Sequence, residues 1–263
     1  MTILDQLAAY ARERVNEARR KLPFEELKKQ ALSRNVSKRE SFAFENALKK
    51  PGLSFICECK KASPSKGLIA PDFPYVRIAG EYEEAGADCI SVLTEPKWFL
   101  GSDRYLREIA DAVKIPCLRK DFTVDEYMIY EAKVLGASAV LLICSILEEE
   151  QMAEYIGLSD ELGLSVLAET HDETEVEMAL EAGARVIGVN NRNLRDFSVD
   201  TANSTRLRKL IPQDVLFVSE SGVGSADDVA ALSEIGADAV LVGETLMRAA
   251  DKKARLQELR GAR

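Results

Sequence analysis

Four short stretches of this chain repeat one theme, and their spacing limits the possible folds more than any other feature. In each stretch a helical pattern ends in Gly-Ala and runs directly into an apolar segment. The stretches are AGADCI at 85–90, LGASAV at 135–140, AGARVI at 182–187 and IGADAV at 235–240. A period of roughly fifty residues is the length of two strand-helix units, so four periods predict eight strands and eight helices. This pattern predicts an α/β fold, the (β/α)8 barrel of about 250 residues.

Eight apolar segments occupy the positions where the barrel needs strands. They are short, rich in Val, Ile and Leu, and lack strict alternation, which is typical of parallel strands buried on both faces. They cover 55–60, 89–93, 117–120, 139–144, 166–169, 186–190, 216–220 and 239–242. Helical patterns lie between most of them, such as 74–85, 124–135, 148–162, 173–182 and 226–235.

The N-terminal section lies outside the repeat. Residues 3–20 carry one apolar stripe and predict a helix, and further helices are expected over 23–32 and 41–48. We expect one domain over 1–263, with a helical extension at 1–50 and the barrel at 53–263. The stripe must be buried somewhere, either against the bottom of the barrel or over its mouth, and we favour the mouth.

The composition limits the classes of binding partner and the cellular compartment that we expect for this protein. The net charge of −9 makes a nucleic-acid partner unexpected, because an acidic surface repels phosphodiester backbones. No signal peptide and no apolar run of about 20 residues is visible, so we expect no membrane partner. The cysteines lie in or beside apolar segments, which indicates reduced thiols in a cytoplasmic protein. No His, Asp and Glu set has metal-ligand spacing, so we expect no metal and no cofactor. We also expect a monomer.

Charged residues follow a second rule, because they fall at the ends of the odd-numbered strands. Glu58 and Lys60 end the first, Lys120 the third, Glu169 the fifth and Glu220 the seventh. Inward side chains of alternate barrel strands share a layer, so these charges are expected to meet at the mouth. The alternative is that each is solvated at the rim. We favour a functional cluster, since burying so many charges is costly unless they pair.

Glycine-containing loops indicate a phosphate site at the same end. Ser221-Gly222 follows the seventh strand, and Gly243-Glu244 follows the eighth and leads into a helix. Loops at these places commonly bind phosphate in this fold. The carboxylate of Glu244 must then point away while its N–H serves the phosphate. The basic loop 63–67 after the first strand is either a lid that contributes to binding or a solvated turn.

Two further features remain open. The sole histidine, His171, lies beyond the end of the fifth strand, and we interpret it as an ordinary loop residue. Trp98 and Phe99, after the second strand, either wall an aromatic pocket or pack their own loop.

Taken together, these motifs resemble the indole-3-glycerol phosphate synthase family over nearly the whole chain. Seven stretches in one order carry the resemblance, which makes it far more specific than any single motif. They are ECKKASPS at 58–65, TEPKWF at 94–99, LRKDF at 118–122, AETHD at 168–172, GVNNRNL at 188–194, SESG at 219–222 and VGETLM at 242–247. The N-terminal helical extension also fits the family's pattern, in which it faces the mouth.

The resemblance implies closure of an indole ring, with loss of carbon dioxide and water, from 1-(2-carboxyphenylamino)-1-deoxyribulose 5-phosphate. It implies that Lys120 is the general acid and Glu169 the proton acceptor or general base. It also implies that Lys60 holds the substrate carboxylate and is oriented by Glu58. The other site residues that it implies are Asn190 and Glu220 for hydroxyls and charges, Ser221, Ser63, Gly222, Gly243 and Glu244 around the phosphate, Arg192 as a local positive charge, and Trp98, Phe99, Phe122, Leu141 and Leu194 around the aromatic ring.

Three other functions remain to be separated by experiment. One is an isomerase barrel acting on a related sugar phosphate, and another is a Schiff-base aldolase that uses Lys120. The third is a binding barrel with an inert site, which an intact set of acid, base and anion anchors argues against.

Overall fold

The computed structural model describes residues 2–33, 40–194 and 196–261, and eight parallel strands form a closed barrel at its centre. Strand β1 pairs with both β4 and β10, which closes the sheet. The barrel strands are β1 Ser54–Cys59, β4 Cys89–Leu93, β5 Cys117–Lys120, β6 Ala139–Ile143, β7 Ser165–Thr170, β8 Val186–Asn190, β9 Leu216–Glu220 and β10 Ala239–Val242. The expected (β/α)8 barrel is therefore confirmed, with strand ends within one residue of the predicted positions.

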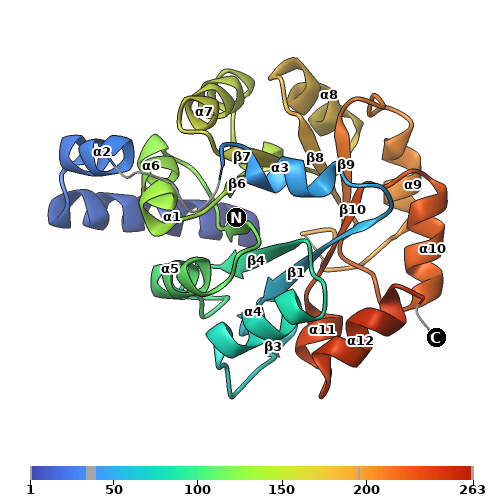
Figure 1. Cartoon of the computed structure of the whole chain (residues 1–263). Helices are drawn as coiled ribbons and strands as arrows, with labels where there is room; N and C mark the ends of the chain where they lie inside the picture. Colours follow the sequence, from blue (N-terminus) through green and yellow to red (C-terminus); the bar gives the residue numbers. More distant parts are fainter. Residues whose placement is uncertain (1, 34–39, 195, 262–263) are drawn as a thin grey trace.

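Helices surround the barrel as an outer ring (Figure 1). They are α4 Tyr75–Glu84, α5 Asp103–Ala112, α6 Glu126–Leu135, α7 Glu149–Glu161, α8 Glu173–Glu181, α9 Ala202–Arg208, α10 Ala226–Glu234, α11 Glu244–Met247 and α12 Lys252–Leu259. A short 3-10 turn, η1 Cys144–Ile146, follows β6. The loop after β1 adds a small hairpin of β2 Ala62–Ser63 and β3 Gly67–Leu68. The hairpin and the helices α5, α9 and α12 were not among the elements that the sequence led us to name.

The Gly-Ala repeat has a backbone cause. All four of its glycines have positive φ angles, which L side chains rarely adopt and which end a helix. The angles are 92° at Gly86, 89° at Gly136, 87° at Gly183 and 77° at Gly236. Each glycine therefore reverses the chain from an outer helix into the next even-numbered strand of the barrel.

The N-terminal section wraps around the barrel instead of covering one end alone. Helix α1 Ile3–Lys21 begins at Thr2, whose side chain accepts a hydrogen bond from the N–H of Asp5. The apolar side chains Ile3, Leu4 and Leu7 reach the cavity that holds the strand-end charges, so α1 lies at the mouth, as favoured above.

The next two helices take other places. Helix α2 Phe24–Ser33 packs against α6 on the side of the barrel. Helix α3 Ala43–Leu48 lies at the opposite end from the mouth, because the N–H of Glu45 donates to Ser165 at the start of β7. In Figure 1, α3 crosses in front of the barrel strands. The bottom of the barrel is thus covered by this short helix and not by the striped one.

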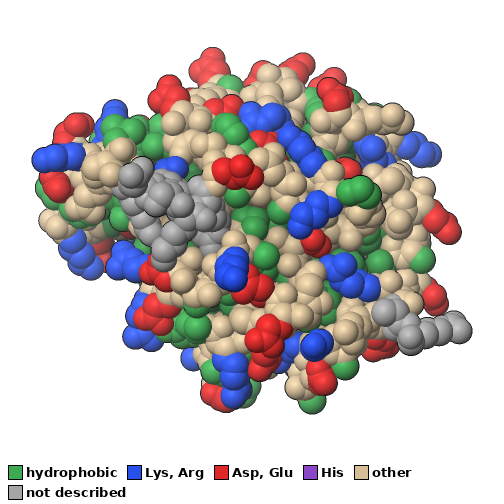
Figure 2. All heavy atoms as spheres, in the orientation of Figure 1, with side chains coloured by type: hydrophobic (Ala, Val, Ile, Leu, Met, Phe, Trp, Pro, Cys, Tyr) green, Lys and Arg blue, Asp and Glu red, His purple; other side chains and the backbone are tan. Residues whose placement is uncertain are grey.

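The surface and interior agree with the composition. Acidic and basic side chains are interspersed over the face shown in Figure 2. All five cysteines are buried, and no disulfide joins any two of them. Within the described residues, no helix has the length and apolar character needed to cross a membrane.

Candidate active site

Three charged side chains from alternate strands meet at the mouth of the barrel. The Nζ atom of Lys120, at the end of β5, lies 2.7 Å from Oε2 of Glu169 on β7 and 3.1 Å from Oε2 of Glu220 on β9. Both carboxylates are buried. The expected cluster of odd-strand charges is therefore present, and its members are paired with one another instead of solvated at the rim.

A glycine between the two carboxylates makes room for this arrangement. Gly188 lies on β8, opposite Glu169 in the strand register. A Cβ atom at Gly188 would meet Oε1 of Glu220 and lie 3.1 Å from Cδ1 of Leu167. Strand β8 therefore has no side chain at the point where its neighbours β7 and β9 place Glu169 and Glu220.

A second ion pair lies beside the first. Nζ of Lys60 donates to Oε1 of Glu58 at 2.6 Å, and the hydroxyl of Ser91 donates to the other oxygen of Glu58 at 3.4 Å. Gly243, after β10, leaves room for this pair, because a Cβ there would meet Oε1 of Glu58 and lie 2.9 Å from Nζ of Lys60. The sequence assigned Gly243 to a phosphate loop, and the structure adds this spatial reason for its lack of a side chain.

The charged side chains of this cluster change one another's pKa values. Burial disfavours the Lys120 ammonium, but Glu169 and Glu220 outweigh it and raise the pKa of Lys120 above its ordinary value. Burial would raise the pKa of Glu169, yet the positive charges of Lys120 and His171 lower it. Burial, reinforced by the Glu169 charge and opposed by Lys120, raises the pKa of Glu220 to about 7. At neutral pH the cluster thus holds a charged ammonium next to an ionised carboxylate.

Asn190 connects this cluster to the loops around it. Its Nδ2 donates to Oε1 of Glu169 at 3.0 Å, and its Oδ1 accepts from the hydroxyl of Ser221 at 2.9 Å and from the N–H of Arg192 at 3.0 Å. Ser221 has a φ of 66°, a left-handed conformation that is uncommon outside glycine. The backbone at the end of β9 is therefore held in an unusual shape next to Glu220.

These groups line one cavity of about 460 Å³. Of the residues that the sequence singled out, the cavity wall includes Glu58, Lys60, Ser63, Phe99, Lys120, Phe122, Leu141, Glu169, Asn190, Arg192, Leu194, Glu220, Ser221, Gly222, Gly243 and Glu244. The rings of Phe99 and Phe122 lie 6.0 Å apart on the apolar side. The volume is that of a small-molecule site.

Trp98 is the exception and is not part of this wall. The carboxylate of Glu95 accepts hydrogen bonds from the N–H groups of Lys97, Trp98 and Phe99, which fixes a tight turn. Within that turn Phe99 lines the cavity, whereas Trp98 packs edge-on against Tyr10 of α1 at 5.6 Å. Trp98, which the resemblance assigned to the aromatic pocket together with Phe99, packs against the N-terminal helix in this structure.

The loops expected to bind phosphate lie together at one side of the cavity. The carboxylate of Glu244 accepts a hydrogen bond from Nε of Arg248 at 2.9 Å. Lys66 of the β1 loop lies 3.6 Å from the same carboxylate. The basic side chains of Lys66 and Arg248 thus line the cavity together with Gly222 and Gly243.

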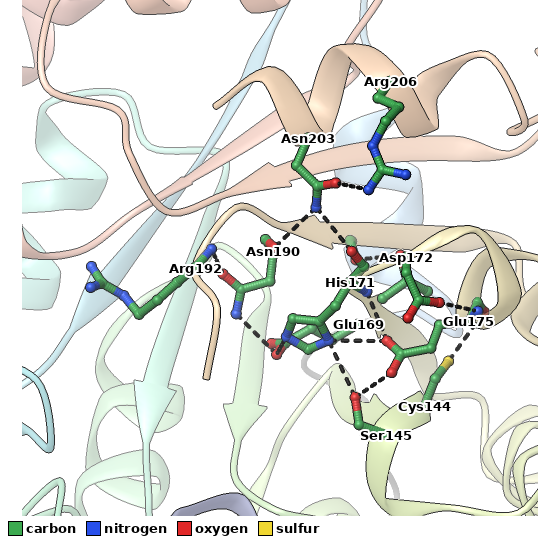
Figure 3. A network of polar contacts seen from close by, with 12 residues as sticks. Cys144, Ser145, Glu169, His171, Asp172, Glu175, Asn190, Arg192, Asn203 and Arg206 are labelled. Atoms are coloured by element: carbon green, nitrogen blue, oxygen red, sulfur yellow. Dashed lines mark hydrogen bonds and ion pairs between the residues drawn. The ribbon is translucent and has the colours of Figure 1, made fainter. Parts of the chain in front are cut away.

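Sequence reasoning missed three parts of the site. It did not identify Arg248 at the cavity edge, nor the ion pair between Arg14 of α1 and Asp121, the residue after Lys120. It also treated His171 as an ordinary loop residue. The structure places that ring 3.5 Å from Oε1 of Glu169 (Figure 3). His171 lies within the AETHD stretch and Arg248 directly follows the VGETLM stretch, but a position in the sequence does not specify contacts, and Arg14 lies near none of the seven stretches.

Among residues 2–33, 40–194 and 196–261, no cluster of three or more His, Cys, Asp or Glu side chains could hold a metal ion.

Comparison with known proteins assigns the chain to a family. The family model described as indole-3-glycerol phosphate synthase matches residues 4–259. A protein of Ruminiclostridium cellulolyticum with that name is 56% identical over 260 residues, covering 99% of each chain. Its namesake from Endomicrobium trichonymphae is 52% identical over 259 residues, covering 98% of this chain and 99% of the relative.

Solved structures agree on the fold. The crystal structure of 3-hexulose-6-phosphate synthase from Salmonella typhimurium superposes with a TM-score of 0.66 at 16% identity, over 80% of this chain and 98% of the other. At that identity the likeness concerns the barrel alone. The family match and the close relatives, together with the site at the mouth, show that this chain belongs to the indole-3-glycerol phosphate synthase family.

Proposed function

We propose that this chain closes the indole ring of 1-(2-carboxyphenylamino)-1-deoxyribulose 5-phosphate, giving indole-3-glycerol phosphate, carbon dioxide and water in tryptophan biosynthesis. The observation that carries the proposal is the placement of Lys120 between Glu169 and Glu220 in the wall of a small-molecule cavity. A charged acid and an ionised base are thereby held next to each other, as a condensation followed by a dehydration requires.

Lys120 is the general acid of the first step in this proposal. Attack of the aromatic ring carbon on the ribulose carbonyl places negative charge on the carbonyl oxygen, and a positioned ammonium can protonate it. Because its neighbours raise the pKa of Lys120, the residue carries its proton when the substrate arrives. Loss of carbon dioxide from the ring carbon then restores the aromatic system.

Glu169 is the base that accepts a proton during dehydration. Its lowered pKa keeps it ionised in the resting site. Once Lys120 has delivered its proton, the cation that lies 2.7 Å from Glu169 becomes neutral and the carboxylate becomes more basic. Acid and base thus act in sequence through the same contact.

The remaining polar residues bind and orient the substrate. In this proposal Lys60, which is held by Glu58, pairs with the substrate carboxylate until that group leaves. Asn190 and Glu220 are assigned to the sugar hydroxyls. The phosphate is assigned to Ser63, Ser221, Gly222, Gly243 and the N–H of Glu244. Arg192, Lys66 and Arg248 add positive charge at the cavity.

The apolar wall accounts for the aromatic end of the substrate. Phe99, Phe122, Leu141 and Leu194 line the cavity with apolar side chains. If the anthranilate ring of the substrate were buried against these residues, its carboxylate would face the charged side chains of the cavity. The two kinds of wall therefore favour a substrate with an aromatic acid at one end and a phosphate at the other.

Indole fluorescence tests the proposal directly. The purified chain is mixed with the carboxyphenylamino substrate, and formation of the indole product is followed by its emission. The proposal fails if no product forms while the protein is folded. Borohydride added during turnover separates the aldolase alternative, since only an imine on Lys120 is trapped as a covalent adduct.

We propose further that the enzyme works as a monomer in the cytoplasm, without metal or cofactor. Buried free thiols fit a reducing compartment. Activity is expected to persist after exhaustive chelation and gel filtration. A loss of activity that Mg²⁺ or Zn²⁺ restores would assign the carboxylates Glu58, Glu169 and Glu220 to a metal instead.

A further inference from the structure

The ring of His171 lies between two carboxylates. Its Nε2 is 3.5 Å from Oε1 of Glu169, and its Nδ1 is 3.0 Å from Oε2 of Glu175 on α8 (Figure 3). The hydroxyl of Ser145 lies 3.3 Å from Nδ1, and the backbone N–H of His171 donates to Glu175 at 2.7 Å. The ring is therefore fixed on one side, and its other nitrogen is aimed at Glu169.

The number of N–H groups on the ring decides which protonation state of His171 suits a position between two carboxylates. An ionised carboxylate only accepts hydrogen bonds, and a neutral imidazole has a single N–H. A neutral ring would therefore turn a lone pair toward one of the two carboxylates. An imidazolium has an N–H for each. Nε2 is buried and makes no hydrogen bond within the described residues, so the Glu169 charge is the partner that it faces.

The surroundings of the ring are mostly acidic. Glu169 on β7, Glu175 on α8 and Glu220 on β9 all favour its positive charge, whereas burial opposes it, and the net effect raises the pKa of His171. Ser145 and Cys144 of η1 approach from β6. The neighbours from α9 are Asn203, whose amide donates to the His171 carbonyl at 3.1 Å, and Arg206, which is bonded to Asn203.

Each oxygen of Glu169 consequently faces its own basic side chain. Lys120 holds Oε2 at 2.7 Å, and His171 faces Oε1 together with the amide of Asn190 at 3.0 Å. With His171 protonated, positive and negative charges alternate from Lys120 through Glu169 and His171 to Glu175. If Lys120 were the sole cation, its proton could pass directly to Glu169 and leave both groups neutral. A second cation on Glu169 makes that transfer unfavourable.

We propose that His171 is a positioning residue for Glu169: its imidazolium, clamped by Glu175 and Ser145, keeps Glu169 ionised so that the acid and the base hold opposite protonation states. The inference rests on the proposed role of Glu169 as the base. His171 acts through that carboxylate and does not line the cavity.

The test uses the fact that the chain has one histidine. In untagged protein, nuclear magnetic resonance of the imidazole nitrogens reports the titration of His171 without any assignment problem. The midpoint is expected above the ordinary value of about 6.5, and to fall in both Glu169→Gln and Glu175→Gln. The matched control is Asp172→Asn, which removes the neighbouring charge but retains a side chain that can cap α8. It should leave the midpoint in place.

Kinetics then test the consequence for the reaction. His171→Gln retains a neutral N–H donor but removes the charge. Its kcat is expected to fall with KM nearly unchanged, and the acid limb of its kcat profile should move up by about one pH unit, a tenfold loss well below the limb. His171→Lys, which restores a cation, should recover part of the shift.

The outcomes separate the two proposals. A wild-type midpoint at or below about 6.5 that does not respond to Glu169→Gln overturns the inference, as does His171→Gln with a wild-type pH profile. If the titrations are coupled but Glu169→Gln retains normal kcat, the ion pair exists, but the assignment of Glu169 as the base fails and the inference fails with it.

Discussion

At the scale of single residues, the site is organised by pairs of opposite charge. Lys120 is shared by Glu169 and Glu220, and Lys60 is held by Glu58. Buried charges are tolerated when they are paired, and breaking a pair leaves an uncompensated charge. Substitutions in the cluster are therefore best made with neutral side chains of similar shape.

Lys120→Met and Glu169→Gln are each expected to lower kcat by at least about 10²-fold, the scale of a positioned acid or base. Circular dichroism should show that both variants remain folded, because both residues lie at the mouth. The double variant should lose less than the product of the single losses, since the two groups act on one substrate. Near-wild-type kcat in either single variant would contradict the assigned roles.

Glycine positions offer a second residue-scale test. In Gly243→Ala the new Cβ pushes against the Glu58–Lys60 pair, so kcat/KM is expected to fall by about tenfold or more, equivalent to about 1.4 kcal/mol. Gly80→Ala is the matched control, because Gly80 lies inside α4 with no atom near the added methyl. That change should leave kinetics alone and raise stability by about 0.5–1 kcal/mol. Equal kinetics for the two variants would show that Gly243 is not needed for space.

At the scale of elements, the N-terminal helix α1 contacts the candidate active site directly. Arg14 of α1 donates two hydrogen bonds, of 3.0 and 2.6 Å, to the carboxylate of Asp121, which directly follows Lys120. Asp121 is fully enclosed and also accepts from Thr94 at 2.5 Å. The same helix contributes part of the cavity wall. A substitution in α1 can therefore alter the position of Lys120 through the adjacent residue Asp121.

A chain that starts at about Ser41 is expected to fold, because all eight barrel strands remain, but to melt at a lower temperature because apolar area is lost. Its KM should rise more than the change in stability explains, and kcat should fall if the mouth closes poorly. Steady-state kinetics well below the melting temperature decide the matter.

A single substitution separates the effect of the Arg14–Asp121 ion pair from the effect of losing the whole N-terminal section. Arg14→Met should raise KM in the same direction as the truncation, since Asp121 loses its strongest partner. Arg12→Met, on the exposed face of the same helix, is the control and should behave as wild type. Unchanged KM and kcat in both the folded truncation and Arg14→Met would mean that α1 only stabilises the barrel.

Prediction of elements from the sequence succeeded where the pattern was both repeated and apolar. The strands follow from buried Val, Ile and Leu segments, and the helix ends follow from glycines that must have positive φ. The helix at 202–208 was not named, because its Asn, Ser and Thr residues have weak helix propensity. The β2–β3 hairpin has two-residue strands, which leave no periodic signal.

The site shows a similar division. Residues at strand ends could be placed from the sequence, because the barrel brings alternate strands into one layer. Contacts made by loops and helix starts could not. His171 meets Glu175 only because α8 begins directly after β7, and Trp98 is turned away from the cavity by the Glu95 turn. Such local geometry has no counterpart in spacing alone.

At the scale of the whole molecule, the buried cluster should be visible in the dependence of stability on pH. The pKa of Glu220 is about 7 in the folded chain, above its ordinary value of 4.5. The folded state therefore binds this proton more tightly than the unfolded state. Its contribution to the free energy of unfolding is complete below about pH 4.5 and is lost as the pH rises through about 7.

Glu220→Gln removes this titration and gives the last prediction. Relative to wild type, the variant should gain stability at pH 8, where wild-type Glu220 is charged, and the gain should shrink as the pH is lowered toward 4.5. Melting temperatures of both proteins at pH 5 and pH 8 measure the difference. Glu234→Gln, at an exposed position of α10, removes the same charge from the surface and should show no such dependence. If Glu220→Gln shifts the melting temperature equally at both pH values, Glu220 is already ionised in the folded chain at pH 5, and burial does not raise its pKa.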